Sequence, residues 1–173
     1  MSEKRDVYFI TGGCGFIGSN FIHYLFEMYD NDIFIINYDK LTYAGNPKNL
    51  ESVKDRSNYR FYQGNSGDSE LVERIFNQYK PDYVINFAAE SHVDRSIGEP
   101  EDFIKTDTLG VFSLLEASRK HAIKRFIQIS TDEVYGSIEE GKFTEETPLF
   151  PSSPYSASKA GGELLVRSYY VTY

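Results

Sequence analysis

Thr11-Gly12-Gly13-Cys14-Gly15-Phe16-Ile17-Gly18 connects a short apolar run, 7–11, to a longer segment with helical spacing, 15–29. The spacing of Gly12, Gly15 and Gly18 is typical of a loop that binds a dinucleotide. In such loops one glycine makes the tight turn, a second lets backbone N–H groups approach a pyrophosphate, and a third packs the helix against the strand. The positive end of the helix dipole then faces the phosphates. Glycines also serve ordinary turns, so the flanking strand and helix carry this prediction.

An acidic residue at the expected distance favours a nicotinamide dinucleotide as the ligand. Asp39 ends the second apolar run, 21 residues after Gly18 (39 − 18), close to the roughly 20 expected for the acid that binds the adenosine ribose. Its carboxylate would accept hydrogen bonds from both ribose hydroxyls and repel a 2′-phosphate, which favours NAD over NADP. The charge of Lys40 could tolerate a phosphate, and a solvated turn residue is the alternative interpretation of Asp39.

The order of the remaining segments predicts one doubly wound α/β domain of the Rossmann type over residues 1–173. Short β-rich apolar runs alternate with helical segments, which implies right-handed crossovers and a parallel sheet with helices on both faces. The runs are 7–11, 33–37, 59–62, 83–88 and 125–130, and the helical segments are 15–29, 68–79 and 100–121. In the last segment, one helical face carries Phe103, Val111, Leu114, Leu115 and Ser118.

Composition and charge exclude several classes of protein. Among 173 residues, 18 Lys+Arg against 26 Asp+Glu give a net charge of −8, without a basic run. A nucleic acid or an anionic membrane surface is therefore not expected as a partner. Cys14 is the only cysteine, so no internal disulfide can form, which suits a reducing compartment. No apolar stretch approaches the roughly 18 residues of a membrane span, and residues 1–6 lack a signal-peptide core, so we expect a cytoplasmic protein.

Tyr155 and Lys159 follow Pro154, where the sequence predicts that a helix begins. A spacing of four residues places both side chains on one helical face. A tyrosine that acts as a base at neutral pH needs its pKa lowered by about three units, or about 4 kcal/mol. The Lys159 ammonium and a cationic nicotinamide ring are two sources of that stabilisation. Surface packing alone can explain this spacing, so the upstream dinucleotide loop gives the pair its weight.

The fifth apolar run leads into Ser130-Thr131-Asp132-Glu133-Val134-Tyr135-Gly136. In a plain strand the carboxylates of Asp132 and Glu133 would point to opposite faces. A turn of the backbone, which Gly136 permits, would direct both at one substrate, where two acids with different pKa values could act as an acid–base pair. A solvated pair at the end of a loop is the alternative interpretation, and spacing alone favours it.

A further candidate segment, 86–96, follows the fourth apolar run. Ala88 and Ala89 are small enough for a cofactor to lie against the backbone, and Ser91 could hydrogen-bond a substrate. His92 has no second His or Cys nearby, so we expect a structural histidine and no metal site.

Five segments together resemble the extended short-chain dehydrogenase/reductase family. They are the glycine loop, Asp-Lys-Leu-Thr-Tyr-Ala-Gly-Asn (39–46), Ala-Ala-Glu-Ser-His-Val-Asp-Arg-Ser (88–96), Ser-Thr-Asp-Glu-Val-Tyr-Gly (130–136) and Tyr-Ser-Ala-Ser-Lys (155–159). Asp132-Glu133 resembles the family's sugar-nucleotide dehydratases rather than the epimerases that share the other segments. The resemblance implies a tightly bound NAD and a nucleotide-sugar substrate, dTDP-glucose, which loses water to become a 4-keto-6-deoxy sugar nucleotide used in deoxysugar and surface polysaccharide biosynthesis.

The resemblance also implies which residues contact NAD. They are Gly12, Gly15, Phe16, Ile17 and Gly18 at the pyrophosphate; Asp39, Lys40, Leu41, Thr42, Asn65 and Ser66 at the adenosine; and Phe87, Ala88, Ala89, Glu90, Ser91, Thr106, Tyr155 and Lys159 on the nicotinamide side. Asn65 and Ser66 replace an acid and an apolar residue that the family usually carries. Asn65 can still accept a hydrogen bond from the adenine amino group.

The resemblance implies chemical roles as well. Tyr155, assisted by Lys159, would take the proton of the sugar C4 hydroxyl as hydride passes to NAD⁺. Glu133 would then remove the C5 hydrogen, and Asp132 would protonate the departing C6 hydroxyl. The implied substrate-binding residues are Ser91 and Thr131. The alternatives are a UDP-sugar 4-epimerase or dehydratase of the same family, and an NAD-binding module without complete catalytic machinery.

Members of the family are longer than this chain and add a small C-terminal substrate domain. The comparison implies that residues 1–173 form the NAD-binding domain and that this chain alone has weak activity or none. Thr106-Asp107 stands where the family commonly has Thr-Asn. The resemblance further implies a homodimer, in which the helix over 103–118 and the helix after Tyr155 form a four-helix bundle with their copies.

Overall fold

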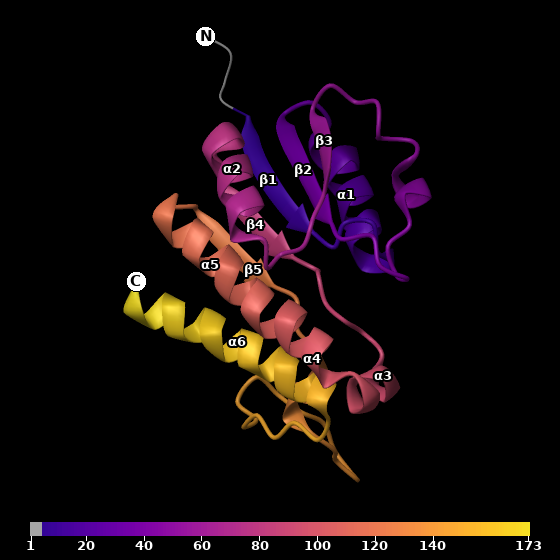
Figure 1. Cartoon of the computed structure of the whole chain (residues 1–173), viewed down its shortest axis with the longest axis vertical. Coiled ribbons are helices and arrows are strands. Elements are labelled where there is room, and N and C mark those ends of the chain that lie inside the picture. The colour runs from indigo at the N-terminus through magenta and orange to yellow at the C-terminus, as the bar shows by residue number, and fades with distance from the viewer. Residues whose placement is uncertain (1–4) are drawn as a thin grey trace.

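The computed structural model describes residues 5–173 and contains, within them, one sheet of five parallel strands (Figure 1). The strands are β1 (Asp6–Thr11), β2 (Ile33–Asp39), β3 (Tyr59–Gln63), β4 (Tyr83–Asn86) and β5 (Arg125–Gln128). Their order across the sheet is β3-β2-β1-β4-β5, which confirms the doubly wound Rossmann-type fold. β4 and β5 are shorter than the predicted runs because the chain leaves the ladder there and lines a cavity.

Helices and short helical turns connect the strands. They are α1 (Phe16–Tyr29), η1 (Pro47–Leu50), α2 (Ser69–Tyr79), α3 (Val93–Gly98), α4 (Pro100–Phe103), η2 (Ile104–Leu109), α5 (Gly110–Lys120), η3 (Asp132–Tyr135) and α6 (Pro154–Thr172). The sequence predicted one helix over 100–121, but the π-helical stretch η2 separates α4 from α5. The predicted apolar face survives this interruption, since its residues from Phe103 to Ser118 are all buried.

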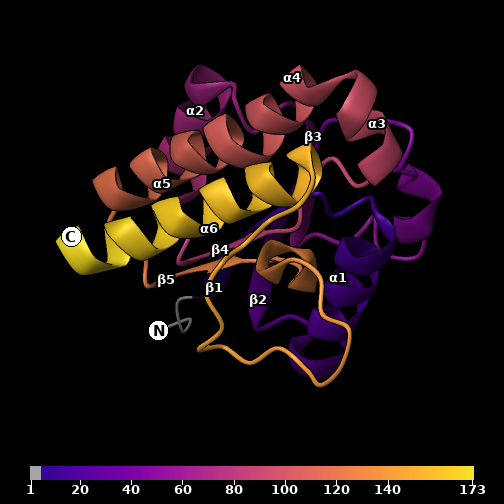
Figure 2. The ribbon, with the colours of Figure 1, turned by 90° about the horizontal axis from the view of Figure 1, so that it is seen from below.

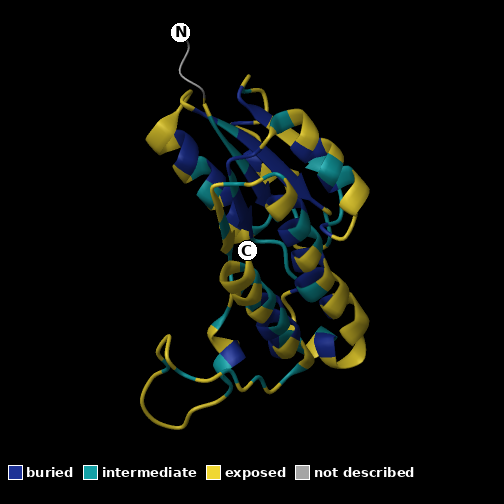
Figure 3. Cartoon of the chain, turned by 90° about the vertical axis from the view of Figure 1, so that its left-hand side faces the viewer, coloured by how far each residue is buried: buried dark blue, intermediate teal, exposed yellow. Residues whose placement is uncertain are grey.

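The two faces of the sheet bury alternate residues of the same strands. On one face, α2 and α5 cover a cluster of Phe9, Ile36, Tyr38, Val72, Ile75, Phe76, Val84, Leu114 and Ala117. On the other face, α1 and the segment between β2 and β3 contribute to a cluster of Ile10, Cys14, Ile22, Leu25, Phe26, Ile33, Ile35, Leu50, Val53, Tyr59 and Ile85. Figure 2 shows the sheet between these two layers, and Figure 3 shows buried residues concentrated along its strands.

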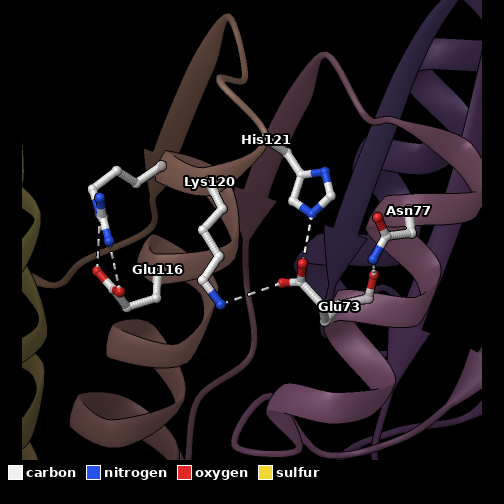
Figure 4. Close-up of polar contacts among 6 residues, drawn as sticks. Glu73, Asn77, Glu116, Lys120 and His121 are labelled. Atoms are coloured by element: carbon white, nitrogen blue, oxygen red, sulfur yellow. Dashed lines mark hydrogen bonds and ion pairs between the residues drawn. The ribbon is translucent and has the colours of Figure 1, made fainter.

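Polar contacts join α2 to the end of α5 (Figure 4). Glu73 Oε1 lies 3.0 Å from His121 Nε2, and Glu73 Oε2 lies 3.8 Å from Lys120 Nζ. Asn77 Nδ2 donates to the Glu73 carbonyl at 2.9 Å, and the His121 ring meets the Phe76 ring edge-on. Partly exposed ion pairs contribute little free energy, so the apolar cluster beneath them is what holds α2 against α5.

The helix α6 lies beside α5 and crosses η2 (Figures 1 and 2). Its start is well defined, because Ser153 Oγ accepts from Ser156 N at 3.0 Å and Ser156 Oγ accepts from Ser153 N at 2.9 Å. Pro154 occupies the first turn, as the sequence predicted. A Cβ at Gly162 would lie 2.4 Å from the Asp107 carbonyl oxygen. Only a glycine therefore lets α6 approach η2 this closely.

Candidate active site

The carboxyl ends of β1, β2 and β4 surround a cavity of about 390 Å³. Ligands of doubly wound sheets bind at this edge of the sheet. The lining residues are Gly12, Gly15, Phe16, Ile17, Gly18, Asp39, Lys40, Thr42, Ala44, Gly45, Phe87, Ala88, Ala89, Glu90, Ser91, Thr106, Ile129, Ser130, Tyr155 and Lys159. The fold thus brings the glycine loop, the acid after β2, the segment after β4 and the Tyr155–Lys159 pair to one place.

The glycine loop lines one side of this cavity with backbone, because Gly12, Gly15 and Gly18 have no side chains. Gly12 has a φ of +65°, which a residue with a side chain rarely adopts. A Cβ at Gly18 would lie 2.4 Å from the Gly12 carbonyl oxygen, so α1 can begin at this point only with glycine there. Gly15 caps α1 without a side-chain hydrogen bond, and the first turn contains no acid. The backbone N–H groups at this helix start are therefore open to an anionic ligand.

Asp39 is buried at the end of β2 and holds the glycine loop in place. Its Oδ2 accepts from the Cys14 backbone N–H at 2.9 Å, and its Oδ1 accepts from the Leu41 N–H at 2.7 Å. Each carboxylate oxygen has two lone pairs, so one remains on each for a further donor such as a ribose hydroxyl.

An aromatic bridge connects two walls of the cavity. Tyr43, from the segment after β2, stacks on His92 with ring centroids 5.0 Å apart. The Arg95 guanidinium lies 4.8 Å from the centre of the Tyr43 ring, and the Tyr43 hydroxyl lies 3.4 Å from Ser91 Oγ. Arg95 also lies 3.8 Å from the carboxylate of Glu90, which lines the cavity. Local sequence patterns give no sign of this role for Tyr43, because the contact with Ser91 joins residues 48 positions apart.

Lys159 is buried in the cavity wall. Its Nζ donates to the Ile129 backbone carbonyl at 2.7 Å, which fixes the amine at the end of β5. Burial lowers the pKa of Lys159, while the carboxylates of Asp107 and Glu163 act in the opposite direction. The amine therefore depends on nearby acids to keep its charge.

Tyr155 is partly buried one helical turn before Lys159, with its ring edge-on to Phe103. Burial raises the pKa of Tyr155, and the carboxylates of Glu133, Asp107 and Asp132 raise it further, against a hydrogen bond from Thr131 that lowers it. A tyrosine that acts as a base at neutral pH needs a lowered pKa. The protein environment does the reverse, so the phenol is protonated at neutral pH without added positive charge.

Asp132 and Glu133 lie on the 3₁₀ turn η3, directly after Thr131. The turn that the sequence analysis required is present, because Thr131 Oγ1 accepts from Glu133 N at 3.3 Å and Gly136 has a φ of +93°. Both carboxylates are exposed and lie outside the cavity lining. They lie close enough to Tyr155 to raise its pKa. The structure therefore places the acid pair on an exposed turn outside the cavity lining, where its charge still acts on the phenol.

Comparison with known proteins identifies the family. Residues 9–173 match the GDP-mannose 4,6 dehydratase family. The chain belongs to this family. Among curated relatives, it is 52% identical over 164 residues to the low-salt glycan biosynthesis protein Agl12 of Haloferax volcanii, covering 95% of this chain and 52% of the relative. It is 48% identical over 176 residues to the dTDP-glucose 4,6-dehydratase of Xanthomonas campestris pv. campestris, covering 96% of this chain and 49% of that enzyme.

A solved dehydratase structure has the same fold. DesIV, the dTDP-glucose 4,6-dehydratase of Streptomyces venezuelae, was crystallised with NAD bound and superposes with a TM-score of 0.91 at 44% identity. The match covers 96% of this chain and 52% of DesIV. The chain therefore spans about half the length of the dehydratase-family proteins it matches.

Some predicted cofactor residues lie outside the cavity, and some lining residues were not predicted. Leu41, Asn65 and Ser66 are absent from the lining. Asn65 Oδ1 accepts from the Gly67 N–H at 3.0 Å, and Ser66 is buried close to Gly110 of α5. Their contact with an adenine in this dehydratase-family fold stays a prediction. The lining residues that were not predicted are Ala44, Gly45, Ile129 and Ser130; no residue-type signal marks them, since they contribute through position.

Cys14 is buried in the glycine loop, and burial raises the pKa of its thiol to about 11. A thiol with so high a pKa is a poor nucleophile, which favours a packing role. Within residues 5–173, no group of three or more His, Cys, Asp or Glu side chains could hold a metal ion. Over the same residues, no helix has the length and apolar character needed to cross a membrane.

Proposed function

We propose that this chain is the NAD-binding domain, residues 1–173, of a dTDP-glucose 4,6-dehydratase, a hydro-lyase. One observation carries the proposal: a single cavity joins an open helix N-terminus lined by glycine, the buried carboxylate of Asp39 and the Tyr155–Lys159 pair. The relatives named dTDP-glucose 4,6-dehydratase support the same assignment. Because those enzymes are about twice as long, the substrate-binding remainder is proposed to lie outside these residues.

The cavity fits NAD on three grounds. The glycine loop offers uncapped N–H groups at the start of α1 for a pyrophosphate. Asp39 keeps an acceptor site on each oxygen for the adenosine ribose, and its negative charge disfavours a 2′-phosphate. Ala88 and Ala89 line the same cavity as Tyr155 and Lys159, and their short side chains leave room for the cofactor. The exposed side chains of Phe16 and Ile17 would flank the pyrophosphate.

The first steps use Tyr155, Lys159 and Thr131. Tyr155 would take the proton of the sugar C4 hydroxyl. The Thr131 hydroxyl would hydrogen-bond the sugar near that hydroxyl, and Ser91 would also contact the substrate. Bound NAD would supply a reversible hydride acceptor and positive charge beside the phenol. Lys159, fixed by Ile129, would keep a second positive charge in the cavity wall. The charge of bound NAD would supply the lowering of the Tyr155 pKa that the surrounding residues do not, since their net effect raises it.

The elimination uses the acid pair. A ketone at C4 makes the C5 hydrogen acidic, and Glu133 would remove it as a base. Asp132, protonated, would give its proton to the C6 hydroxyl as that group leaves as water. Both groups lie on the exposed turn η3, and the effect of their charges on the pKa of Tyr155 supports a role for them near the phenol. The reduced cofactor would supply the hydride that adds to C6, and the proton held by Glu133 would return to C5, which would complete the 4-keto-6-deoxy product.

A homodimer through a four-helix bundle is part of the proposal. Within the described residues, α5 and α6 lie side by side (Figure 1). Apolar side chains remain exposed along both helices. These side chains include Phe112, Leu164 and Tyr170. Covering them with a second copy would remove that apolar surface from water. A cytoplasmic location is also proposed, since the one cysteine is a free thiol.

The test of the activity uses the whole protein that contains this domain. With Glu133→Gln, addition of dTDP-glucose is expected to form NADH transiently, because Tyr155 can still act, while no 4-keto-6-deoxy sugar accumulates. Unchanged dehydration in this variant would reject Glu133 as the base. Parallel assays with UDP-glucose separate the alternative: a 4-keto or epimerised product from UDP-glucose alone would replace the proposed substrate.

A further inference from the structure

Asp107 is a buried acid that the proposed reaction does not use. It lies on η2, and only 2% of its surface is exposed. An ionised carboxylate at such a position is costly unless it is hydrogen-bonded and paired with positive charge. The contacts around Asp107 therefore indicate what it does.

The two carboxylate oxygens of Asp107 join two different elements. Oδ1 accepts from the backbone N–H of Glu90, in the cavity wall after β4, at 3.1 Å. Oδ2 accepts from Ser158 Oγ, on α6, at 3.0 Å. The neighbouring Thr108 Oγ1 donates to the Ser158 carbonyl at 3.1 Å, so η2 holds this residue of α6 at two points. Ser158 directly precedes Lys159.

The charge of Asp107 also acts on Lys159. Burial lowers the pKa of Lys159, and two nearby acids raise it. Asp107 has the larger raising effect, and Glu163 on α6 has the smaller. The charged and titratable groups that face Asp107 are Lys159 and Tyr155 from α6 and Glu90 from the wall after β4. Lys159 is the positive group among them. Each of the two charges therefore favours the ionised form of the other.

We propose that Asp107 is a positioning residue for Lys159: it fixes the first turns of α6 against the wall at Glu90 and keeps the buried amine charged. The chemical consequence rests on the proposed function, in which Lys159 acts as an ammonium beside NAD. The electrostatic coupling itself does not require NAD.

The direct test measures the charge state of Lys159 in the 173-residue chain without cofactor. Trace acetic anhydride labels only neutral amines, and peptide mass spectrometry reports labelling of Lys159 relative to exposed Lys54. Asn at position 107 keeps an acceptor for the Glu90 N–H and offers an amide to Ser158, but carries no charge. With Asp107→Asn, labelling of Lys159 at a fixed pH is expected to rise about tenfold. Asp102→Asn, an exposed acid on α4, is the matched control and leaves labelling unchanged.

A second variant separates position from charge. Ser158→Ala removes the hydroxyl that Asp107 Oδ2 accepts from, but keeps the carboxylate. Faster amide hydrogen exchange over residues 155–160, with labelling of Lys159 close to the original value, is expected. Equal labelling in Asp107→Asn and the original chain would overturn the proposed charge role. Unchanged exchange in Ser158→Ala would overturn the proposed fixing of α6.

The reciprocal measurement guards against an Asp107 variant that fails to fold. Lys159→Met removes the ammonium, and the titration of Asp107 is followed by carbon-13 NMR of its carboxyl group. Its midpoint, expected at about 6 in the original chain, should move to higher pH when the positive charge is lost. An unmoved midpoint contradicts the coupling. Absence of NAD binding would reject the proposed function and leave both of these readouts intact.

Discussion

The helices α1 and α6 both begin at the same cavity, but their N-termini are built in opposite ways. α1 starts at Gly15 with no side-chain cap and no acid in its first turn. α6 starts with a reciprocal capping box between Ser153 and Ser156 and has Pro154 in its first turn. The Ser153 side chain therefore satisfies a backbone N–H group in the first turn of α6. No side chain does the same for α1, so its first N–H groups stay open. The difference supports the proposal that α1 binds a ligand through its backbone, whereas the capped start of α6 holds its own side chains, Tyr155 among them, in fixed positions.

The largest expected effect on stability and NAD binding comes from adding a side chain to the glycine loop at the start of α1. A Cβ at Gly18 would lie 2.4 Å from the Gly12 carbonyl oxygen, and backbone cannot swing aside as a flexible side chain can. Gly18→Ala should therefore lower the free energy of unfolding by about 3 kcal/mol or more. Chemical denaturation measures this loss, and calorimetry should show NAD binding largely abolished.

Gly98→Ala is the matched control, since a Cβ at the end of α3 would meet nothing within 4 Å. Its stability and NAD affinity should equal those of the original chain. A Gly18→Ala variant that binds NAD like this control would show that the start of α1 is not the pyrophosphate site.

The start of α1 could be predicted from the sequence because its determinants are local. The glycine spacing, the flanking strand and helix, and Asp39 at the end of β2 all lie within one strand–helix–strand unit. The helix start at Pro154 was equally visible, since a proline followed by a helical pattern marks a first turn. For the same reason the fold class followed from the alternation of strands and helices.

The rest of the site depends on contacts between distant residues, which local patterns do not reveal. The Tyr43–His92 stack and the hydrogen bond from Ser158 to Asp107 join segments far apart in the chain. The π-helical η2 packs closely against α6 at Gly162, and this contact joins residues far apart in the chain. Asn65 was assigned to adenine by resemblance, but its side chain turns back onto the Gly67 N–H. That contact depends on loop geometry rather than on residue type.

A pH-dependent effect is expected at the contact that holds α6. Burial raises the pKa of Asp107 from 3.8 to about 6, a difference worth about 3 kcal/mol. A raised pKa means that the folded state favours the protonated acid. The stabilising contribution of protonated Asp107 is therefore fully present below pH 3.8 and is lost as the pH rises through about 6. Asp107→Asn, which mimics the neutral acid, should raise the free energy of unfolding by up to about 3 kcal/mol at pH 7.5.

Denaturation curves of both chains at several pH values check this prediction. The difference should shrink as the pH falls from about 6 to about 4, where Asp107 itself becomes neutral. A difference that stays constant across this range would mean that the charge of Asp107 has no part in it.

A smaller effect is expected from uncapping α6. Ser153→Ala removes the hydroxyl that accepts from Ser156 N, at a cost of about 1 kcal/mol in the free energy of unfolding. Because this end fixes Tyr155, hydrogen exchange should quicken in the first turn of α6 and not in α1. Ser153→Thr keeps an acceptor and should restore most of the loss. Equal exchange in the alanine and threonine variants would show that the capping box does not order this end.

The smallest effect on stability should come from giving α1 the kind of cap that α6 has. Gly15 has φ −74° and ψ 174°, which any residue adopts, and an added Cβ would lie 3.3 Å from the Gly12 carbonyl oxygen. Gly15→Ser should therefore change the free energy of unfolding by only about 0.5 kcal/mol. The serine oxygen would accept from an N–H group that is open in the original chain, so NAD affinity should fall about tenfold. Calorimetry measures that fall, with Gly98→Ser as the control outside the cavity. If Gly15→Ser folds normally and binds NAD as tightly as the original chain, the open start of α1 does not bind the ligand, and its contrast with α6 concerns helix stability alone.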